Sequence, residues 1–173
     1  MEDPSPRLME LDPVKLAKHL RYQFQLDWEG IHGPSHWARV RALGLLLARD
    51  TGADPAVVEL FAWLHDSRRQ NDEYDPEHGK RAASYAAELR GDFFDVTDEQ
   101  LALLQEACRG HSDGHLEADV TVQTCWDADR LDLGRVGITP DPALLCTEAA
   151  RSPELRRLAE ARADRWSQWS WSR

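Results

Sequence analysis

The stretch DPAVVELFAWLHD (residues 54–66) decides the fold, because it is apolar on almost every side. A helix that is apolar all round is buried in the centre of a globular protein. Asp54 followed by Pro55 is typical of a helix start, since aspartate caps the free backbone N–H groups and proline suits the first turn. The stretch ends in His65 and Asp66, whose burial is costly unless a partner compensates them. It therefore predicts a central helix with a polar site at its end.

The segments on either side show the 3.6-residue periodicity of amphipathic helices. Before the central helix, the pattern predicts helices over residues 13–28 and 36–49, the second capped by Ser35. After it, helices are predicted over residues 75–91, 98–110, 119–131 and 153–169, with an irregular connection at LGRVGITPDP (133–142). Thr97 and Gln100 have the spacing of a capping box. The expected fold class is all-α, a compact bundle of about six to eight helices.

The chain length of 173 residues fits one domain with a single core. We expect residues 1–10 to form a flexible N-terminal arm and residues 11–173 to form a single domain with a Trp-rich C-terminal helix. Trp166 and Trp169 have helical spacing, and they are expected to pack on the domain or on a second copy in a homodimer.

Charge and cysteine content limit the class of protein. A net charge of -10 argues against non-specific binding of nucleic acid or anionic membranes. The three cysteines include no CxxC pair and are expected to be reduced thiols. The acidic N-terminus does not resemble a signal peptide, and no apolar run is long enough to span a bilayer. These features predict a cytoplasmic protein with no membrane partner.

Histidines and aspartates occur in order on the apolar sides of the predicted helices: His36, His65 with Asp66, and Asp129. A single histidine on such a stripe is more often a hydrogen-bonded core residue than a ligand. The adjacent pair is a stronger signal, because two buried ionisable neighbours need a partner. Imidazole and carboxylate together suit a divalent ion of Mn, Fe, Co, Ni, Zn or Mg. The pattern predicts a metal site.

Five segments resemble the HD domain superfamily of metal-dependent phosphohydrolases, in particular its small single-domain bacterial members. They are HGPSHWARV (32–40), FAWLHD (61–66), EHGKRAA (77–83), GHSDG (110–114) and WDADRLDLGRVGI (126–138). The resemblance implies a helical fold and hydrolysis of a phosphoester in a nucleotide or related small molecule, with water activated by the metal. It also implies that the metal ligands are His36, His65, Asp66 and Asp129.

The remaining candidates concern the substrate. His78 and His111 are predicted to contact the scissile phosphate or orient water, and together with Asp66 they form the expected catalytic set. A role for both histidines as ligands of a second metal is the alternative. Arg39 and Arg68 are predicted to bind the phosphate, because they flank ligand positions and a guanidinium matches phosphate oxygens.

Other cations are interpreted differently. Arg69 and Arg81 are expected to be solvated surface side chains, and Arg130 is expected to pair with Asp132.

Three functions remain open at this stage. The first is a phosphohydrolase with one metal ion per chain, favoured over two because four protein ligands suffice for one octahedral ion. The second is an HD-type di-iron oxygenase, in which His78 and His111 would both have to bind metal. The third is a non-catalytic regulatory module stabilised by its metal.

Overall fold

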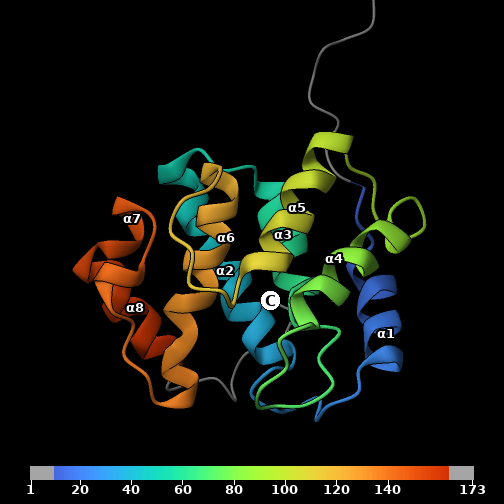
Figure 1. Ribbon diagram of the computed structural model, residues 1–173, viewed down its shortest axis with the longest axis horizontal. Coiled ribbons are helices and arrows are strands. Elements are labelled where there is room, and N and C mark those ends of the chain that lie inside the picture. Colours follow the sequence, from blue (N-terminus) through green and yellow to red (C-terminus); the bar gives the residue numbers. More distant parts are fainter. Residues whose placement is uncertain (1–9, 164–173) are drawn as a thin grey trace, which may run out of the picture.

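The computed structural model describes residues 10–163, which form helices joined by short loops (Figure 1). No β-strand occurs in this range, and the only extended pairing is two isolated bridges to Phe94 from Leu11 and Arg90. The all-α prediction is confirmed. The helices are α1 (Pro13–Gln23), α2 (Pro34–Thr51), α3 (Pro55–Leu64), α4 (His78–Leu89), α5 (Asp98–Gly110), α6 (Val120–Leu131), α7 (Glu148–Arg151) and α8 (Pro153–Ala163), with 3-10 turns η1 (Asp132–Val136) and η2 (Pro142–Leu144).

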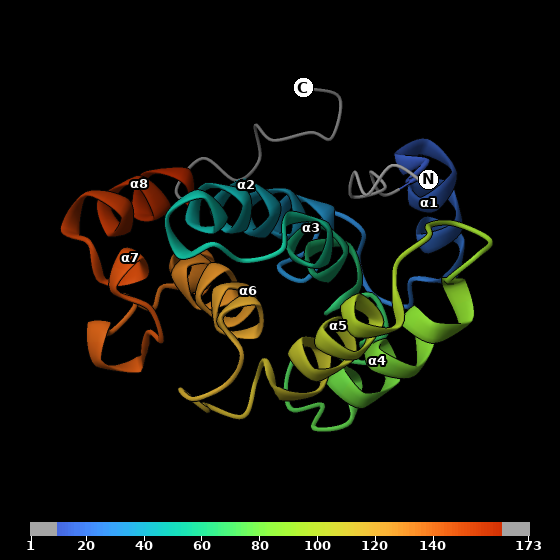
Figure 2. The same cartoon turned by 90° about the horizontal axis from the view of Figure 1, so that it is seen from above.

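Helix α3 is the central helix, as its apolar sequence predicted. Seven of its ten residues are buried, and Asp54 caps it by accepting hydrogen bonds from the N–H groups of Ala56 and Val57. Helices α2, α5 and α6 pack around it, while α4 packs on the far side of α5 (Figures 1 and 2). Burial of each large apolar side chain stabilises the folded state by about 1.5 to 3 kcal/mol. The packing around α3 therefore holds the end of this helix in place.

Two predicted helix boundaries are wrong, namely the end of α1, where aromatic rings pack on another helix, and the start of α2. Helix α1 ends at Gln23 rather than at residue 28, and Phe24 turns to an extended conformation. The rings of Phe24 and Trp28 then pack edge-on against Trp37 of α2, at centroid distances of 5.4 and 5.6 Å. Helix α2 begins at Pro34 after Gly33, so Ser35 lies inside the helix and is not its cap.

The start of α4 also differs from the prediction. The helix begins at His78, because the Asp75 carboxylate does not cap it. Instead, this carboxylate accepts hydrogen bonds from the backbone N–H of Gln70 and from Arg81, which ties down the loop between α3 and α4. Arg81 therefore forms an ion pair with Asp75, with 2.6 Å between Nη2 and Oδ2, and the prediction of a solvated side chain is wrong.

Helices α4 and α5 approach each other closely at Gly79. A Cβ atom at this position would lie 2.4 Å from the carbonyl oxygen of Cys108, so only glycine permits the approach. The contact brings the first residue of α4, His78, beside His111 at the end of α5.

Helix α8 extends to Ala163, and the Trp-rich segment with Trp166, Trp169 and Trp171 lies outside the described residues, as do residues 1–9 of the expected arm. Among the described helices, none combines the length and the apolar character needed to cross a bilayer.

Candidate metal centre

The ends of five helices meet at one polar site in the core. Helix α2 contributes its third residue, α3 is followed directly by the His-Asp pair, and α6 contributes a residue of its last turn. Helix α4 begins and α5 ends at the same place. The site thereby gathers His36, His65, Asp66, His78, His111 and Asp129.

The four predicted metal ligands lie within contact distance of one another. The Nε2 atom of His36 lies 3.0 Å from Nε2 of His65 and 3.1 Å from an Asp129 oxygen. The Oδ2 atom of Asp66 is 3.5 Å from Nε2 of His36 and 3.6 Å from Nε2 of His65. Because α3 ends at Leu64, His65 and Asp66 lie beyond the helix and point to a common centre.

The same aspartate also faces a second pair of histidines. The Nε2 atoms of His78 and His111 lie 2.8 Å apart, and each is 3.4 Å from Oδ1 of Asp66. The two oxygens of this one carboxylate therefore face two different groups of donors. Both groups, His36–His65–Asp66 and Asp66–His78–His111, have ligand atoms close enough together to hold a metal ion.

Hydrogen bonds orient all four imidazoles in the same way. Each ring donates a hydrogen bond from Nδ1. The acceptor of His36 is the Asp132 carboxylate, and the acceptors of His65, His78 and His111 are the backbone carbonyl oxygens of Phe61, Asp75 and Cys108. A carbonyl or an ionised carboxylate only accepts, so Nδ1 carries the proton. In each neutral ring, the lone pair is then on Nε2 and points into the centre.

This arrangement fits a divalent cation. In each pair of histidines, two unprotonated Nε2 atoms at 2.8 to 3.0 Å have no hydrogen to share, so their lone pairs repel unless a positive charge lies between them. Imidazole nitrogens with carboxylate oxygens are the donors that transition-metal ions prefer. The Nδ1 hydrogen bonds are the outer contacts that orient metal-binding histidines.

The electrostatics of the site favour ionised carboxylates. When protonated, His65 stabilises the Asp66 carboxylate by its charge, and His111, His32 and His78 do so by hydrogen bonds. They outweigh burial, which acts to raise the pKa of Asp66, and hold this pKa well below its usual value. The pKa of Asp129 is likewise held well below its usual value against burial by His36 and His65. Burial lowers the pKa of His36, which favours the neutral form that binds metal.

Asp132 lies directly behind the site and is fully buried. Its Oδ2 accepts from His36 Nδ1 at 2.7 Å, and its Oδ1 accepts from Arg39 Nε at 2.7 Å. The expected ion pair between Arg130 and Asp132 is therefore wrong. Arg39 is only 1% exposed and does not line the cavity, so it supports His36 through Asp132 and is not placed to bind a substrate.

Arg68, the other predicted phosphate ligand, is also turned away from the cavity. Its guanidinium lies over the ring of Tyr85, 4.7 Å from the ring centre. The neighbouring Arg69, which was expected to be a solvated surface residue, donates from Nε to Oδ1 of Asp66 at 3.0 Å. At the end of α3 the chain turns, and this turn decides which of the two arginines faces the site.

Two further residues at the site were missed in the sequence. His32 precedes α2, and its Nδ1 lies 3.0 Å from Oδ2 of Asp66 while its Nε2 lies 3.2 Å from the Asp72 carbonyl. Arg135 comes from η1, where it binds the carbonyl oxygens of Ile31 and Asp132. Neither residue lies in a regular helical pattern, so periodicity gives no signal for them. The remaining hint is that both lie within segments that carry the HD resemblance.

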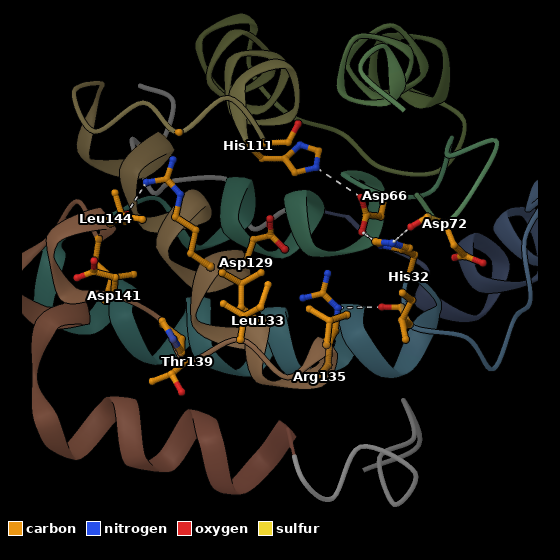
Figure 3. Close-up of a pocket in the computed structure, with 18 of the residues that line it drawn as sticks. His32, Asp66, Asp72, His111, Asp129, Leu133, Arg135, Thr139, Asp141 and Leu144 are labelled. Atoms are coloured by element: carbon orange, nitrogen blue, oxygen red, sulfur yellow. Dashed lines mark hydrogen bonds and ion pairs between the residues drawn. The ribbon is translucent and has the colours of Figure 1, made fainter. Parts of the chain in front are cut away.

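A cavity of about 540 Å³ opens beside the centre (Figure 3). His32, Asp66, His111 and Asp129 lie on one side of it, and Leu144 and Asp141 lie on the other. Arg69 and Arg135 also line it. Pockets of roughly 300 to 1,000 Å³ accommodate small organic ligands. A small molecule in the cavity can therefore reach Asp66, His111 and Asp129 of the candidate metal centre.

Comparisons with known proteins show the fold. No protein-family model and no curated protein matches the chain. Among solved structures, the chain is similar to the crystal structure of a predicted HD superfamily hydrolase from an uncultured Thermotogales bacterium. The TM-score is 0.66 at 24% sequence identity, and the match covers 91% of this chain and 90% of the other. The expected HD-domain fold is confirmed.

Proposed function

We propose that this protein is a metal-dependent phosphohydrolase that acts on a nucleotide or a related small phosphoester. One observation carries the proposal. Each oxygen of the Asp66 carboxylate faces a different pair of histidines, and this carboxylate lies at the wall of an open cavity. Divalent ions held there would lower the pKa of a bound water and stabilise negative charge on phosphoryl oxygens. The fold, which is that of a predicted HD superfamily hydrolase, supports the same chemistry.

The side chains around the centre have distinct roles in this proposal. His36, His65, Asp66 and Asp129 would hold the first ion, and Asp66, His78 and His111 the second. His32 and Arg69 each hold one oxygen of Asp66 and so fix the rotation of the carboxylate. Arg135 lies at the cavity wall with Nε and Nη1 engaged by carbonyl oxygens, which holds its guanidinium in place for a phosphate.

We propose two ions for each chain, although the sequence alone favoured one. The reason is geometric: His78 and His111 face each other through unprotonated Nε2 atoms, as His36 and His65 do. A substrate phosphate would not relieve that repulsion, because it is itself negative. A second cation would.

The count can be measured with His78→Ala. Wild-type protein is expected to bind about two transition-metal ions per chain, and the variant about one, since only one of the two groups loses a ligand. Elemental analysis after gel filtration measures the ratio. His115→Ala is the control, because His115 is an exposed histidine outside both groups. A wild-type ratio of one that is unchanged in His78→Ala would restore the single-ion prediction.

The function itself is tested by reconstitution. Protein stripped of metal is loaded separately with Mn, Fe, Co, Ni, Zn or Mg and incubated with nucleotides and simple phosphoesters. Phosphate release is expected with at least one ion and none without metal. A di-iron oxygenase, for which the same paired groups would serve, would consume oxygen with the iron-loaded form and release no phosphate. A regulatory module would bind metal and do neither.

A further inference from the structure

We infer that the substrate is a phosphate monoester of an uncharged, largely apolar alcohol, and that the apolar side chains of residues 133–145 bind the alcohol. This inference rests on the proposed phosphohydrolase function. It concerns the apolar part of the cavity lining, which phosphate transfer itself does not require. Six side chains make up this part: Leu133, Val136, Ile138, Pro140, Leu144 and Leu145.

Exposed apolar residues are concentrated at this cavity. Nine large apolar side chains are exposed between residues 10 and 163, and four of them line it. They are Ile31, Val136, Ile138 and Leu144, the last two being 52% and 57% exposed. Apolar surface gathered in one place and bordered by polar groups is typical of a binding site. A ligand that covered these side chains would gain the free energy of their removal from water.

The apolar wall is held in place before a ligand arrives. The buried Asp127 accepts hydrogen bonds from the N–H groups of Cys146 and Thr147, just after the wall ends. Arg130 donates from Nη1 to the Leu144 carbonyl at 2.9 Å. The Asp141 carboxylate caps η2 by accepting from the N–H of Ala143. A preformed wall loses little conformational entropy on binding.

The charges around the cavity favour a single phosphate. Asp141 lines the cavity on the side opposite His32 and His111, whereas Asp72 and Glu73 line it next to His32 and Arg69 (Figure 3). These three carboxylates would repel the extra charges of a polyphosphate. Arg130, a cation on the side of Leu144, already donates to the carbonyl oxygens of Leu144 and His115. The cavity therefore offers one place for a phosphate, at the metal centre, and apolar groups with the carboxylate of Asp141 on the opposite side.

Binding of stable phosphonates tests the inference without turnover. Calorimetry on metal-loaded protein is expected to show that benzylphosphonate binds about tenfold or more tightly than methylphosphonate, because only its ring reaches the apolar wall. The double variant Ile138→Ser/Leu144→Ser should lose about tenfold in benzylphosphonate affinity and keep its methylphosphonate affinity. Both residues are exposed, so the fold is retained. Val14→Ser, an equally apolar exposed site on α1, should leave both affinities unchanged.

A second calorimetric measurement tests whether the cavity takes a single phosphate. Inorganic tripolyphosphate is expected to bind no more tightly than inorganic phosphate. Equal affinity for the two phosphonates, an unchanged ratio in the double variant, or tighter tripolyphosphate binding would each overturn the inference. If phosphoesters are nevertheless hydrolysed, the proposed function stands and only the assigned substrate class fails. If no phosphonate binds and no phosphoester is hydrolysed, both fail.

Discussion

Asp66→Asn is expected to remove metal from both groups and to lower kcat/KM for phosphoesters by about a thousandfold or more. The substitution keeps the shape of the side chain but removes its negative charge and leaves one oxygen. Asp66 is the one residue common to both candidate groups, so its loss affects both ions, whereas loss of a histidine affects one. Elemental analysis and phosphate release measure the two effects.

The control for this variant is Asp95→Asn, an exposed aspartate far from α3 in the sequence. It should retain wild-type metal content and activity. Circular dichroism must show that Asp66→Asn is folded, because metal bound only to the native state adds to stability and its loss lowers the melting temperature. Wild-type metal stoichiometry in folded Asp66→Asn would show that the carboxylate is not a ligand.

The largest effect on stability is expected for Asp132→Asn. Asp132 is completely buried and pairs with Arg39, which is itself 1% exposed. Removal of the carboxylate charge leaves the guanidinium buried without a counter-ion, because neither side chain can reach water. Breaking a buried ion pair in this way typically costs about 3 to 5 kcal/mol. Urea denaturation of the metal-free variant and wild type measures the difference in the free energy of unfolding.

The same variant should also weaken metal binding. The substituted side chain would present an amide instead of a carboxylate to His36 Nδ1, so the tautomer that exposes the Nε2 lone pair is less favoured. Loss of such an outer contact usually costs about 10- to 100-fold in metal affinity. Glu59→Gln is the matched control, because Glu59 forms a half-buried pair with Arg41 between α2 and α3, and 37% of the Arg41 side chain is exposed. Solvent that reaches Arg41 screens this pair, and ion pairs that solvent reaches contribute about 0 to 1 kcal/mol. Equal losses in the free energy of unfolding in the two variants would contradict the assignment of Asp132.

Helical structure and the central position of α3 could be predicted because they follow from local pattern. The run after Asp54 is apolar on almost every side, and the cap at Asp54 and the capping box of Thr97 and Gln100 were recognised from spacing alone. Boundaries were missed where long-range packing competes with the local signal. Phe24 and Trp28 leave the helical pattern because Trp37, which lies in the next helix, gives their rings a partner.

The order of His36, His65, Asp66 and Asp129 in the sequence predicted which residues would meet, and the structure brings them together. The sequence could not show which arginine faces the cavity. Arg68 and Arg69 are adjacent, and only the turn after α3 places Arg69 on Asp66 and Arg68 on Tyr85. Arg39 lies one turn from His36, yet its partner Asp132 comes from a segment 93 residues away.

The sequence by itself thus determined the helices, the central position of α3 and the identity of the residues that meet at its end. These follow from periodicity, capping and the cost of burying ionisable groups. Only the tertiary structure decided that one carboxylate, Asp66, serves two pairs of histidines. That depends on the close approach of α4 and α5 at Gly79, a contact between helices that no local pattern encodes.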